Sequence, residues 1–430
     1  MELKELIEIV HGTLLNDYQD VLINGFSVDT RTMKSDEVYI ALRGKKMDGH
    51  KFINNDIQAS VVISEEDIVL DKIPVIKVNN TYDSLFFLGQ YIRNKYNIPL
   101  IAITGSNGKT TLKELITNIL SIKYKVLFSR ENNNNIIGVF KTLKELDDSY
   151  DIGVIEMGMN HKGEISQLSK MVKPNKAIIT NIGSSHIGNL KNKKDIYHAK
   201  MEITDGLDGE LIVNGDDKYL KKCHGFKCGY GNNNDLIAYN IKIYNHYISF
   251  DIYIDQEYQV VFPIPSKYYI QSLLEAIKIG LDYHIAITDI LKVIRQFKPV
   301  DGRLKIIPLR KYTIIDDAYN ANYESIKCGL NTLKNISKHK IIILGDMLEL
   351  GNYSKKYHRK LNKILKKIDN KNVITVGNDT KYIKSIHFLN NDDVIKYLQN
   401  INLDNTYIYL KASHGMHLDY IIKWLKKLSN

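Results

Sequence analysis

The residues of this chain best suited to chemistry lie in a glycine-flanked loop after a short apolar run. The run PLIAI reads as a buried strand, and residues 104–111 (TGSNGKTT) follow it. Gly105 and Gly108 let backbone amides approach an anion closely, and a helix starting near Thr110 turns its positive end to the same point. The loop therefore predicts a phosphate site, with Lys109 reaching the β- and γ-phosphates of a nucleotide and the Thr110 hydroxyl reaching Mg²⁺.

The loop is shorter than the standard Gly-x4-Gly-Lys-[Ser/Thr] pattern, which would need a glycine at Ile103. A bare Gly-x-x-Gly-Lys-Thr string is common by chance and would alone indicate an ordinary turn. Here a strand-like run precedes it and an apolar helical pattern follows it, and this context favours nucleotide binding. The predicted cradle consists of Gly105, Ser106, Asn107, Gly108, Lys109, Thr110 and Thr111.

Three residues downstream of the loop suit a metal-nucleotide site. Glu156 ends a strand-like run, where a carboxylate can meet Mg²⁺ beside a phosphate loop. His186 follows a second strand-like run, and Lys200 lies in a helical stretch. Each residue alone could be structural, since a strand-end Glu is commonly solvated. In this order behind a phosphate loop, they are better explained as metal-site residues, with Thr110 completing the set.

The elements that must position these residues predict an α/β protein of three domains. The central domain, residues 81–303, contains a helix at 81–96 and strands at 153–155 and 177–179 that alternate with helices, which predicts a parallel sheet. Residues 239–264 alternate with a two-residue period, which predicts an antiparallel appendage. Two further domains flank this one: residues 1–80, and residues 304–430, whose strand-helix rhythm predicts a Rossmann-like fold without a second dinucleotide loop.

The first domain offers small hydroxyls, an arginine and a turn with glycine and lysine. These groups suit an anionic ligand such as a diphosphate, although a solvated loop explains them equally well when they are taken alone. The candidate binding residues are Ser27, Thr30, Arg31, Lys45, Asp48 and His50.

Composition predicts a soluble cytoplasmic protein. The chain has 430 residues, 44% hydrophobic and 25% charged, with no apolar run of membrane-spanning length. The net charge of +10 is spread over scattered lysines, which favours a small polyanionic substrate over nucleic acid. Cys223 and Cys228 lack a second ligand pair, so we expect plain thiols and no zinc site. We also expect a monomer.

Taken together, these motifs resemble the Mur ligase family of ATP-dependent amide-forming enzymes. The matching features are the short phosphate loop, Glu156, His186 and the Ala199-Lys200 pair. Within the last domain, residues 316–322 (DDAYNAN) and 345–351 (GDMLELG) resemble the MurF branch, which adds D-alanyl-D-alanine to a UDP-N-acetylmuramoyl tripeptide. The first domain is similar to the family's UDP-binding domain, so the resemblance runs nearly end to end.

The resemblance implies a reaction and assigns roles. ATP and Mg²⁺ would convert a carboxylate to an acyl phosphate, which an amine then attacks, in the synthesis of peptidoglycan precursors. By resemblance, Arg303 reaches the γ-phosphate, Asp317 the ribose, and Lys200 occupies a position that carries a carbamate in several members. Lys109, His186, Lys200 and Arg303 would be catalytic. Asn135 and Asn320 would join the nucleotide site, and Asn322 the substrate site.

The chain also departs from the family pattern. The adenine-side motif His-Asn-x-x-Asn reads YYIQS from Tyr268, so both asparagines are missing. Tyrosine can stack on adenine but cannot reproduce amide hydrogen bonds. Tyr323 stands where the family has a proline, and the late Lys-Gly-Ser element reads KAS from Lys411. These changes bear on the choice of nucleotide and substrate more than on the reaction class.

Two other functions stay open from the sequence. One keeps the amide-ligase chemistry with another substrate, as in a folylpolyglutamate synthase or a diverged Mur ligase. The other is a nucleotide-binding regulator that makes no amide. The residues Asp29, Thr30 and Arg31 in a distinct first domain favour a UDP-linked substrate over folate. Mere nucleotide binding would not require a matched set of charged residues from Glu156 to Arg303.

Overall fold

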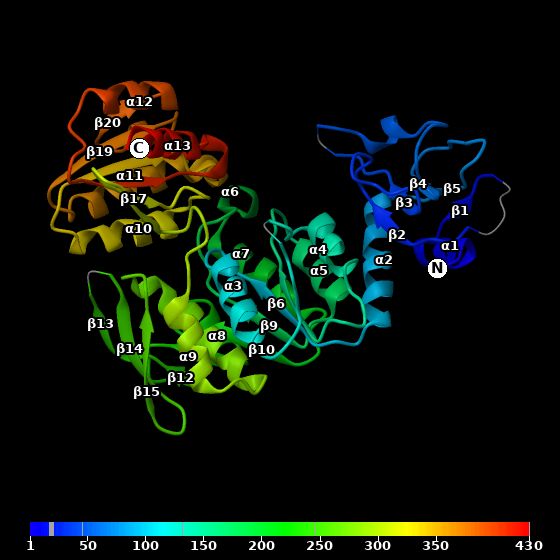
Figure 1. Ribbon diagram of the computed structural model, residues 1–430, viewed down its shortest axis with the longest axis horizontal. Helices are drawn as coiled ribbons and strands as arrows, with labels where there is room; N and C mark the ends of the chain where they lie inside the picture. The colour runs from blue at the N-terminus through cyan, green and yellow to red at the C-terminus, as the bar shows by residue number, and fades with distance from the viewer. Residues whose placement is uncertain (17–20, 45, 131, 245, 430) are drawn as a thin grey trace.

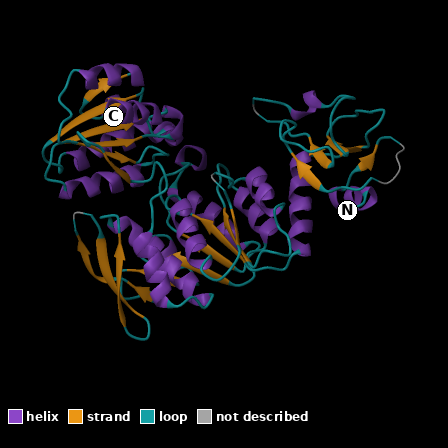
Figure 2. Cartoon of the chain, in the orientation of Figure 1, coloured by secondary structure: helices purple, strands orange, loops and turns teal. Residues whose placement is uncertain are grey.

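The computed structural model describes residues 1–16, 21–44, 46–130, 132–244 and 246–429. Within them the strands form four sheets that follow one another along the chain (Figure 1). Figure 2 shows helices and strands interleaved through most of the molecule, and this confirms the predicted α/β class with three sheet-bearing domains. In the described part of the chain, no helix is long and apolar enough to cross a membrane.

The first domain holds a five-stranded sheet in the order β1-β5-β4-β3-β2. All its pairings are parallel except β1 with β5. Apolar side chains cover both faces of this sheet, and one of the two resulting clusters is continuous with the core of the central domain. The elements are α1 (Leu3–Val10), β1 (Thr13–Leu14), β2 (Gly25–Ser27), β3 (Glu37–Ile40), the 3-10 helix η1 (Gly49–Phe52), β4 (Val61–Ser64) and β5 (Val75–Lys77).

The central domain is built on a seven-stranded parallel sheet in the order β12-β11-β10-β9-β6-β8-β7. Strand β6 lies between β9 and β8 and is buried throughout, as expected for the centre of a parallel sheet. Its elements up to β9 are α2 (Thr81–Lys95), β6 (Leu100–Thr104), α3 (Lys109–Leu120), β7 (Val126–Phe128), α4 (Ile136–Leu143), β8 (Ile152–Glu156), α5 (Glu164–Val172) and β9 (Lys176–Ile179).

The second half of the central domain completes the sheet and adds the predicted antiparallel appendage β13-β14-β15. Helices α2, α4 and α5 contact one another, as do α3, α8 and α9. The elements are α6 (Ile187–Leu190), α7 (Lys193–Met201), η2 (Glu202–Thr204), β10 (Glu210–Asn214), η3 (Leu220–Lys222), β11 (Phe226–Gly229), β12 (Leu236–Ile237), β13 (Tyr239–Ile243), β14 (Ile248–Tyr253), β15 (Glu257–Phe262), η4 (Lys267–Tyr269), α8 (Ile270–Asp282) and α9 (Ile287–Gln296).

The last domain contains a six-stranded sheet in the order β16-β17-β21-β18-β19-β20, parallel except for β16. Part of its core forms a separate apolar cluster. The elements are β16 (Lys305–Pro308), β17 (Thr313–Asp316), α10 (Tyr323–Thr332), η5 (Leu333–Asn335), β18 (Lys340–Gly345), η6 (Leu348–Tyr353), α11 (Ser354–Leu365), β19 (Lys371–Val376), η7 (Thr380–Tyr382), β20 (Ile386–Phe388), α12 (Asn391–Gln399), β21 (Tyr407–Lys411), η8 (His414–Met416) and α13 (Asp419–Leu428).

The first and last domains lie at different ends of the central one (Figure 1). The division predicted at residues 80 and 81 falls at the start of α2, and the one at 303 and 304 falls just before β16. Both divisions stay predictions.

Candidate active site

The predicted phosphate loop joins β6 to α3 at the carboxyl edge of the central sheet. Gly105 and Gly108 have φ angles of +149° and +85°. A Cβ on Gly105 would lie 1.9 Å from the Thr180 hydroxyl oxygen, so no larger residue fits there. No side chain caps the amino end of α3, which begins at Lys109, one residue before the predicted start. Its first amides therefore remain open to an anion.

The middle of the loop is fixed by residues that follow β9. The Ser106 and Asn107 amides donate to the main-chain and side-chain oxygens of Asn181, at 3.0 and 3.1 Å. The Thr180 hydroxyl donates to the Asn107 carbonyl at 2.6 Å, and the Gly183 amide donates to the Ser106 hydroxyl at 2.8 Å. These bonds hold the middle of the loop in one conformation.

Glu156 lies at the end of β8 and is the centre of a hydrogen-bonded group. Its Oε2 atom accepts from the Thr110 hydroxyl and its Oε1 atom from the Asn134 side-chain amide, both at 2.9 Å. Arg303 donates to the same Thr110 hydroxyl from Nη2 at 2.9 Å. The predicted metal residues Thr110 and Glu156 are thus in contact, and the predicted γ-phosphate residue Arg303 contacts Thr110.

Lys109 is folded back onto its own loop. Its Nζ atom donates to the Gly105 carbonyl at 2.8 Å. Burial lowers the pKa of Lys109, while the Glu156 carboxylate acts in the opposite direction. An anion entering the loop would compete with a neutral carbonyl for this ammonium group, and charge-assisted hydrogen bonds are the stronger kind.

His186 and Lys200 lie deeper in the same region. His186 precedes α6 with a left-handed φ of +60°, which is uncommon for a residue other than glycine. Burial and then the Lys200 ammonium lower the pKa of His186 to about 3, so the ring is neutral at pH 7. Lys200 is buried on α7, and burial followed by the Lys109 charge lowers its pKa well below the usual value. Within the described residues its ammonium forms no hydrogen bond or ion pair.

Glu202 is the acid closest to Lys200 in sequence, but it has other partners. Its carboxylate accepts from the Gly163 amide at 2.9 Å and from the Ser166 amide at 3.3 Å. A pairing of Lys200 with Glu202 is therefore not found.

A cavity of about 340 Å³ lies between the central and last domains. Residues of both domains line this cavity, so most of the predicted nucleotide and metal residues lie around one space. Gly105 and Lys200 do not line it. The predicted residues that do are Ser106, Asn107, Gly108, Lys109, Thr110, Thr111, Asn135, Glu156, His186, Arg303, Asp317, Asn320 and Asn322.

Polar contacts join the two domains beside this cavity. The Asn322 side-chain amide donates to Asn107 Oδ1 at 2.7 Å and to the Ser185 hydroxyl at 2.5 Å. Glu324 accepts from the Ser184 hydroxyl and from Lys193 Nζ at 2.5 and 2.7 Å. The last domain therefore contacts the phosphate loop directly.

Three of the predicted nucleotide residues already have partners in the fold. Asp317 is buried, and its Oδ2 atom lies 2.8 Å from Lys411 Nζ and accepts from the Tyr409 hydroxyl at 2.9 Å. Burial raises the pKa of Asp317, whereas the Lys411 charge lowers it. The side-chain oxygens of Asn135 and Asn320 each accept a nearby backbone amide, so all three residues contribute to local structure whatever else they bind.

The chain matches a model of the Mur ligase middle domain at residues 103–280 and a model of the Mur ligase glutamate ligase domain at residues 302–401. It is 34% identical over 389 residues to a protein of Bacillus subtilis named UDP-N-acetylmuramoyl-tripeptide–D-alanyl-D-alanine ligase, covering 87% of this chain and 84% of the relative. This chain belongs to the MurF branch of the Mur ligase family.

Solved structures agree with this membership. MurF from Acinetobacter baumannii matches this Mur ligase with a TM-score of 0.89 and 27% identity, over 99% of this chain and 98% of the other. MurF from Thermotoga maritima, solved in complex with ADP, shares the fold with a TM-score of 0.85 and 24% identity, over 95% and 99%. The resemblance stated from the motifs is confirmed.

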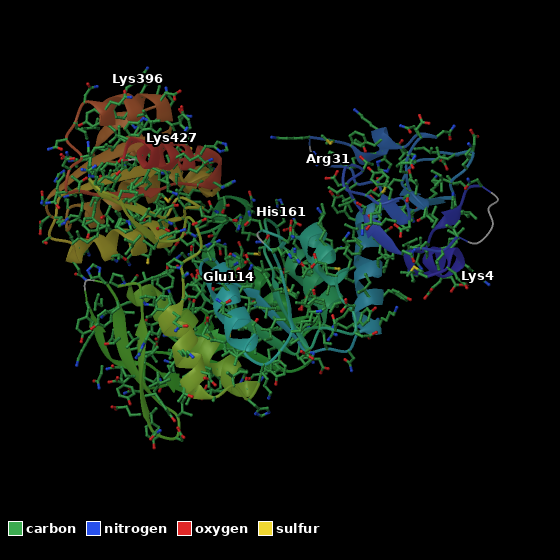
Figure 3. All side chains as sticks on the ribbon, in the orientation of Figure 1. Lys4, Arg31, Glu114, His161, Lys396 and Lys427 are labelled. Carbon is green, nitrogen blue, oxygen red and sulfur yellow. The ribbon has the colours of Figure 1, made fainter. Side chains whose placement is uncertain are left out.

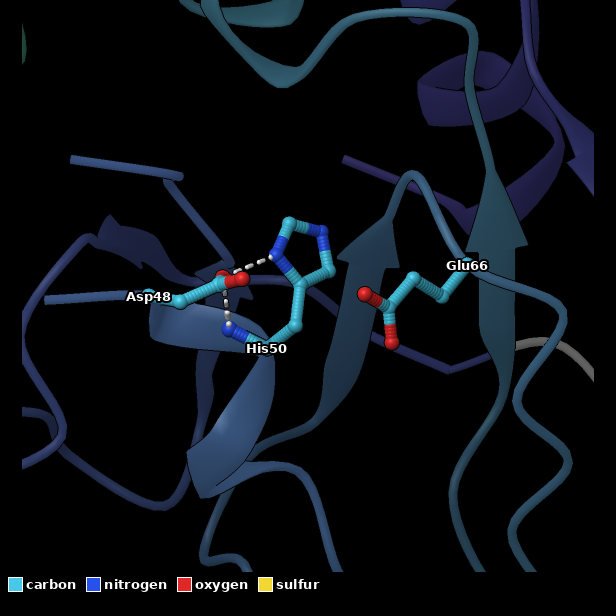
Figure 4. Close-up of side chains that lie close together, drawn as sticks. All are labelled: Asp48, His50 and Glu66. Carbon is cyan, nitrogen blue, oxygen red and sulfur yellow. Dashed lines mark hydrogen bonds and ion pairs between the residues drawn. The ribbon is translucent and has the colours of Figure 1, made fainter. Parts of the chain in front are cut away.

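The predicted substrate residues of the first domain lie outside the cavity. His50 Nδ1 is 2.7 Å from Asp48 Oδ1 (Figure 4), and the Glu65 amide donates to His50 Nε2 at 3.1 Å. The ring therefore donates from Nδ1 to Asp48, and this bond lowers the pKa of Asp48 to about 2. Arg43 binds Asp48 and Glu66 at 3.0 and 2.6 Å. Asp48, His50 and Glu66 are close enough together to suggest a metal site, but both ring nitrogens are occupied.

The second predicted group in the first domain surrounds Asp29. Arg31 forms an ion pair with Asp29 at 2.7 Å, which lowers the pKa of Asp29 to about 2, yet the Arg31 side chain remains 85% exposed. Ser27 donates to the Asp29 carbonyl at 3.1 Å, and Thr30 is half-buried. Arg31 lies at the edge of its domain that faces the other two (Figure 3). Lys45 lies outside the described residues.

Sequence reasoning missed three contributors to the site of this Mur ligase. Asn134 contacts Glu156, the Tyr319 ring lies 4.3 Å from the Arg303 guanidinium, and Glu349 Oε2 lies 3.3 Å from His186 Nδ1. Asn134 adjoins the predicted Asn135, Tyr319 lies in the DDAYNAN motif and Glu349 lies in the GDMLELG motif, so the sequence marked all three segments. Nothing in their spacing indicated which side chain would face the cavity.

Gly188→Ala should lower kcat by about 10- to 100-fold, because the new Cβ would lie 2.9 Å from both the Glu349 carbonyl oxygen and the Gly351 amide nitrogen. These are backbone atoms, so α6 and η6 would have to separate, and His186 would move with α6. Steady-state phosphate release checks this, with a thermal melt to confirm folding. Asn189→Ala, at the exposed neighbouring position, is the control. Wild-type turnover in folded Gly188→Ala would contradict the expected displacement.

Proposed function

We propose that this Mur ligase joins D-alanyl-D-alanine to a UDP-N-acetylmuramoyl tripeptide at the expense of ATP, as a step of peptidoglycan precursor synthesis. The proposal is supported by the names of the chain's relatives and by the residues that line the cavity. We also propose that the reaction takes place in the cytoplasm and that the chain acts as a monomer.

The observation that carries the proposal is the contact of Arg303 with the Thr110–Glu156 pair. Nucleotide binding alone would need only the loop. Here a guanidinium from the junction with the last domain reaches a hydroxyl at the start of α3, 2.9 Å away, beside a buried carboxylate. Charges contributed by the central domain and by its junction with the last domain around one phosphate site suit phosphoryl transfer, in which catalysis consists mainly of positioning and charge stabilisation.

The donor set also fits Mg²⁺. The Glu156 carboxylate and the Thr110 hydroxyl are hard oxygen ligands, and His186 offers a neutral imidazole. Among the described residues, Arg303 Nε is buried without a hydrogen-bond partner, as expected for a group that a ligand completes. We assign Thr110, Glu156, His186 and Lys200 to the metal region. A bound Mg²⁺ would neutralise phosphate charge and make the γ-phosphorus easier to attack.

The chain's own residues then account for both half-reactions. The loop amides and Lys109 hold the phosphates of ATP, and Arg303 stabilises the charge on the transferred γ-phosphoryl group. The substrate carboxylate attacks the γ-phosphorus, ADP leaves, and an acyl phosphate forms. The neutral amine of the second substrate attacks the acyl carbon, the C–N bond forms, and phosphate departs with the proton that the amine loses. Asn322, at the domain contact, is placed to meet the second substrate, while Asp317 and Asn320 flank the ribose.

The first domain supplies the proposed site for the UDP moiety. Arg31 is exposed and paired only with its neighbour Asp29 in the described residues, so a diphosphate can compete for it. Asp48 and His50 shape the neighbouring turn, and Ser27, Thr30 and Lys45 complete the proposed set. A folate substrate carries no diphosphate, so it would leave these residues of the first domain without a ligand.

A phosphate-release assay tests the function. We expect release only when ATP, a UDP-N-acetylmuramoyl tripeptide and D-alanyl-D-alanine are all present, with the pentapeptide product detected by mass. Turnover with folate and glutamate instead would indicate the alternative ligase. ATP binding with no release under any combination would indicate a regulator.

GTP should replace ATP with a loss in kcat/KM of no more than about tenfold, or about 1.4 kcal/mol. Tyr268 and Tyr269 line the nucleotide cavity where the family has a histidine and an asparagine, and a stacked ring discriminates bases weakly. The Tyr269 hydroxyl already donates to the Arg303 carbonyl at 3.2 Å. Measurement of kcat/KM for both nucleotides checks the prediction. Tyr268→Phe is the control for its hydroxyl, which forms no hydrogen bond within the described part of the chain. A thousandfold ATP preference would contradict it.

A further inference from the structure

Glu349 is a carboxylate at the cavity to which neither the motifs nor the proposed function assigns a role. Its Oε2 atom lies 3.3 Å from His186 Nδ1. That nitrogen is buried and forms no hydrogen bond in the described structure. The Glu349 side chain is 35% exposed, so its carboxylate is free to rotate toward the ring. No other carboxylate among the described residues forms an ion pair with His186.

The fold fixes the segment that carries Glu349. Just before it, Asp346 is buried and accepts the backbone amides of residues 378–380 at 2.8 to 3.0 Å. The Met347 amide donates to His358 Nε2 at 3.2 Å, and the Leu348 amide donates to the Ser413 hydroxyl at 2.9 Å. Three successive residues are therefore anchored within the last domain, and Glu349 projects from a rigid base.

The other partner, His186, belongs to the central domain, and glycines allow the two segments to meet. Gly188 and Gly351 approach so closely that a Cβ on Gly351 would lie 3.1 Å from the Gly188 Cα. The Tyr353 hydroxyl donates to the Lys191 carbonyl at 2.7 Å and secures the same contact. Glu349 therefore reaches His186 only while the two domains touch.

A histidine that binds a metal through one nitrogen usually donates its other N–H to a carboxylate, which fixes the tautomer and the ring orientation. We propose that Glu349 is the positioning residue for His186: it accepts Nδ1–H, and the Nε2 lone pair is thereby left for a divalent cation in the cavity. This inference rests on the metal role of His186 in the proposed function. It adds that the last domain completes the metal site of the central one.

Binding of Mn²⁺ in the presence of a non-hydrolysable ATP analogue tests the proposal by electron paramagnetic resonance titration. One ion is expected with the nucleotide phosphates at Thr110 and a second at His186, so the wild-type protein should bind two ions. Glu349→Ala should weaken one of them by about 10- to 100-fold. Glu349→Gln should retain most of the affinity, because its amide oxygen can still accept Nδ1–H. Equal losses in Glu349→Gln and Glu349→Ala would overturn the proposal, since they would show that the charge near Lys109 and Lys200 matters and not the hydrogen bond.

Glu324→Ala is the matched control, because Glu324 is also a carboxylate of the last domain that binds the central one, at Ser184 and Lys193. If Glu324→Ala weakens the same ion as much as Glu349→Ala does, domain contact alone is responsible and the proposal fails. His186→Ala separates this failure from that of the proposed function. If it leaves both ions bound, the metal role of His186 is wrong, and the inference falls with it. If Glu349→Ala binds both Mn²⁺ ions with wild-type affinity while His186→Ala loses one, this inference is overturned and the proposed function still holds.

Discussion

Lys109→Ala is expected to lower turnover by about 10³-fold and to leave binding of the UDP-linked substrate unchanged. Lys109 starts α3 and donates to the Gly105 carbonyl within the phosphate loop, whereas the proposed UDP residues lie in the first domain. Loss of the ammonium removes charge stabilisation from the phosphates of ATP alone. A coupled phosphate assay gives the rate, and calorimetry with the UDP-linked substrate gives the affinity.

Lys123→Ala is the control for this change, because Lys123 is exposed just beyond the end of α3 and should tolerate substitution. If folded Lys109→Ala lost affinity for the UDP-linked substrate in proportion to its rate, one site would have to serve both ligands, and the two-site assignment would be abandoned.

Lys200→Ala should lower kcat by about 10²- to 10³-fold, and short carboxylic acids such as acetate should restore part of the activity. The Lys200 amine is buried, and burial and Lys109 lower its pKa well below the usual value. Since a neutral amine is the form that reacts with dissolved CO₂, the surroundings favour a carbamate. A carbamate would present an anion toward His186 and the cation region, and a carboxylic acid can replace that anion after truncation.

Lys194→Ala, an exposed lysine on the same helix, should keep wild-type activity and show no response to acetate. Absence of rescue by acids of several sizes would favour a plain ammonium at Lys200. Electron density that ends at the Lys200 nitrogen in a metal-loaded crystal would lead to the same conclusion.

Local patterns were sufficient to predict most of the fold. The apolar run before Gly105 became β6, and the alternation at residues 239–264 became a separate antiparallel sheet. These elements depend on the periodicity of neighbouring residues, which a sequence displays directly. Local patterns could not show where the domains meet, because Asn322 and Asn107 contact each other across more than 200 positions of sequence. Only the family resemblance brought Asp317 and Asn322 to this site.

In the candidate site too, residues placed by local patterns were predicted, and residues placed by the arrangement of the domains were not. Thr110 and Glu156 were predicted together because each follows a parallel strand whose end lies at one sheet edge. Glu349 was not, because its position beside His186 depends on the rotation of one domain against another and on the two glycines that allow it. The surroundings of Lys200 were also hidden, since its nearest acid in sequence binds elsewhere.

The contacts of Arg303 and Asn322 with the phosphate loop bear on how ATP is conserved in the cell. With the domains apart, the loop could still hold a nucleotide, but the guanidinium beside Thr110 would be missing. Water could then reach the γ-phosphate, yet the charge that speeds its transfer would be absent. We therefore expect slow ATP hydrolysis in the absence of the carboxylate substrate. The γ-phosphate should be transferred only when the domains are in contact around a bound acceptor.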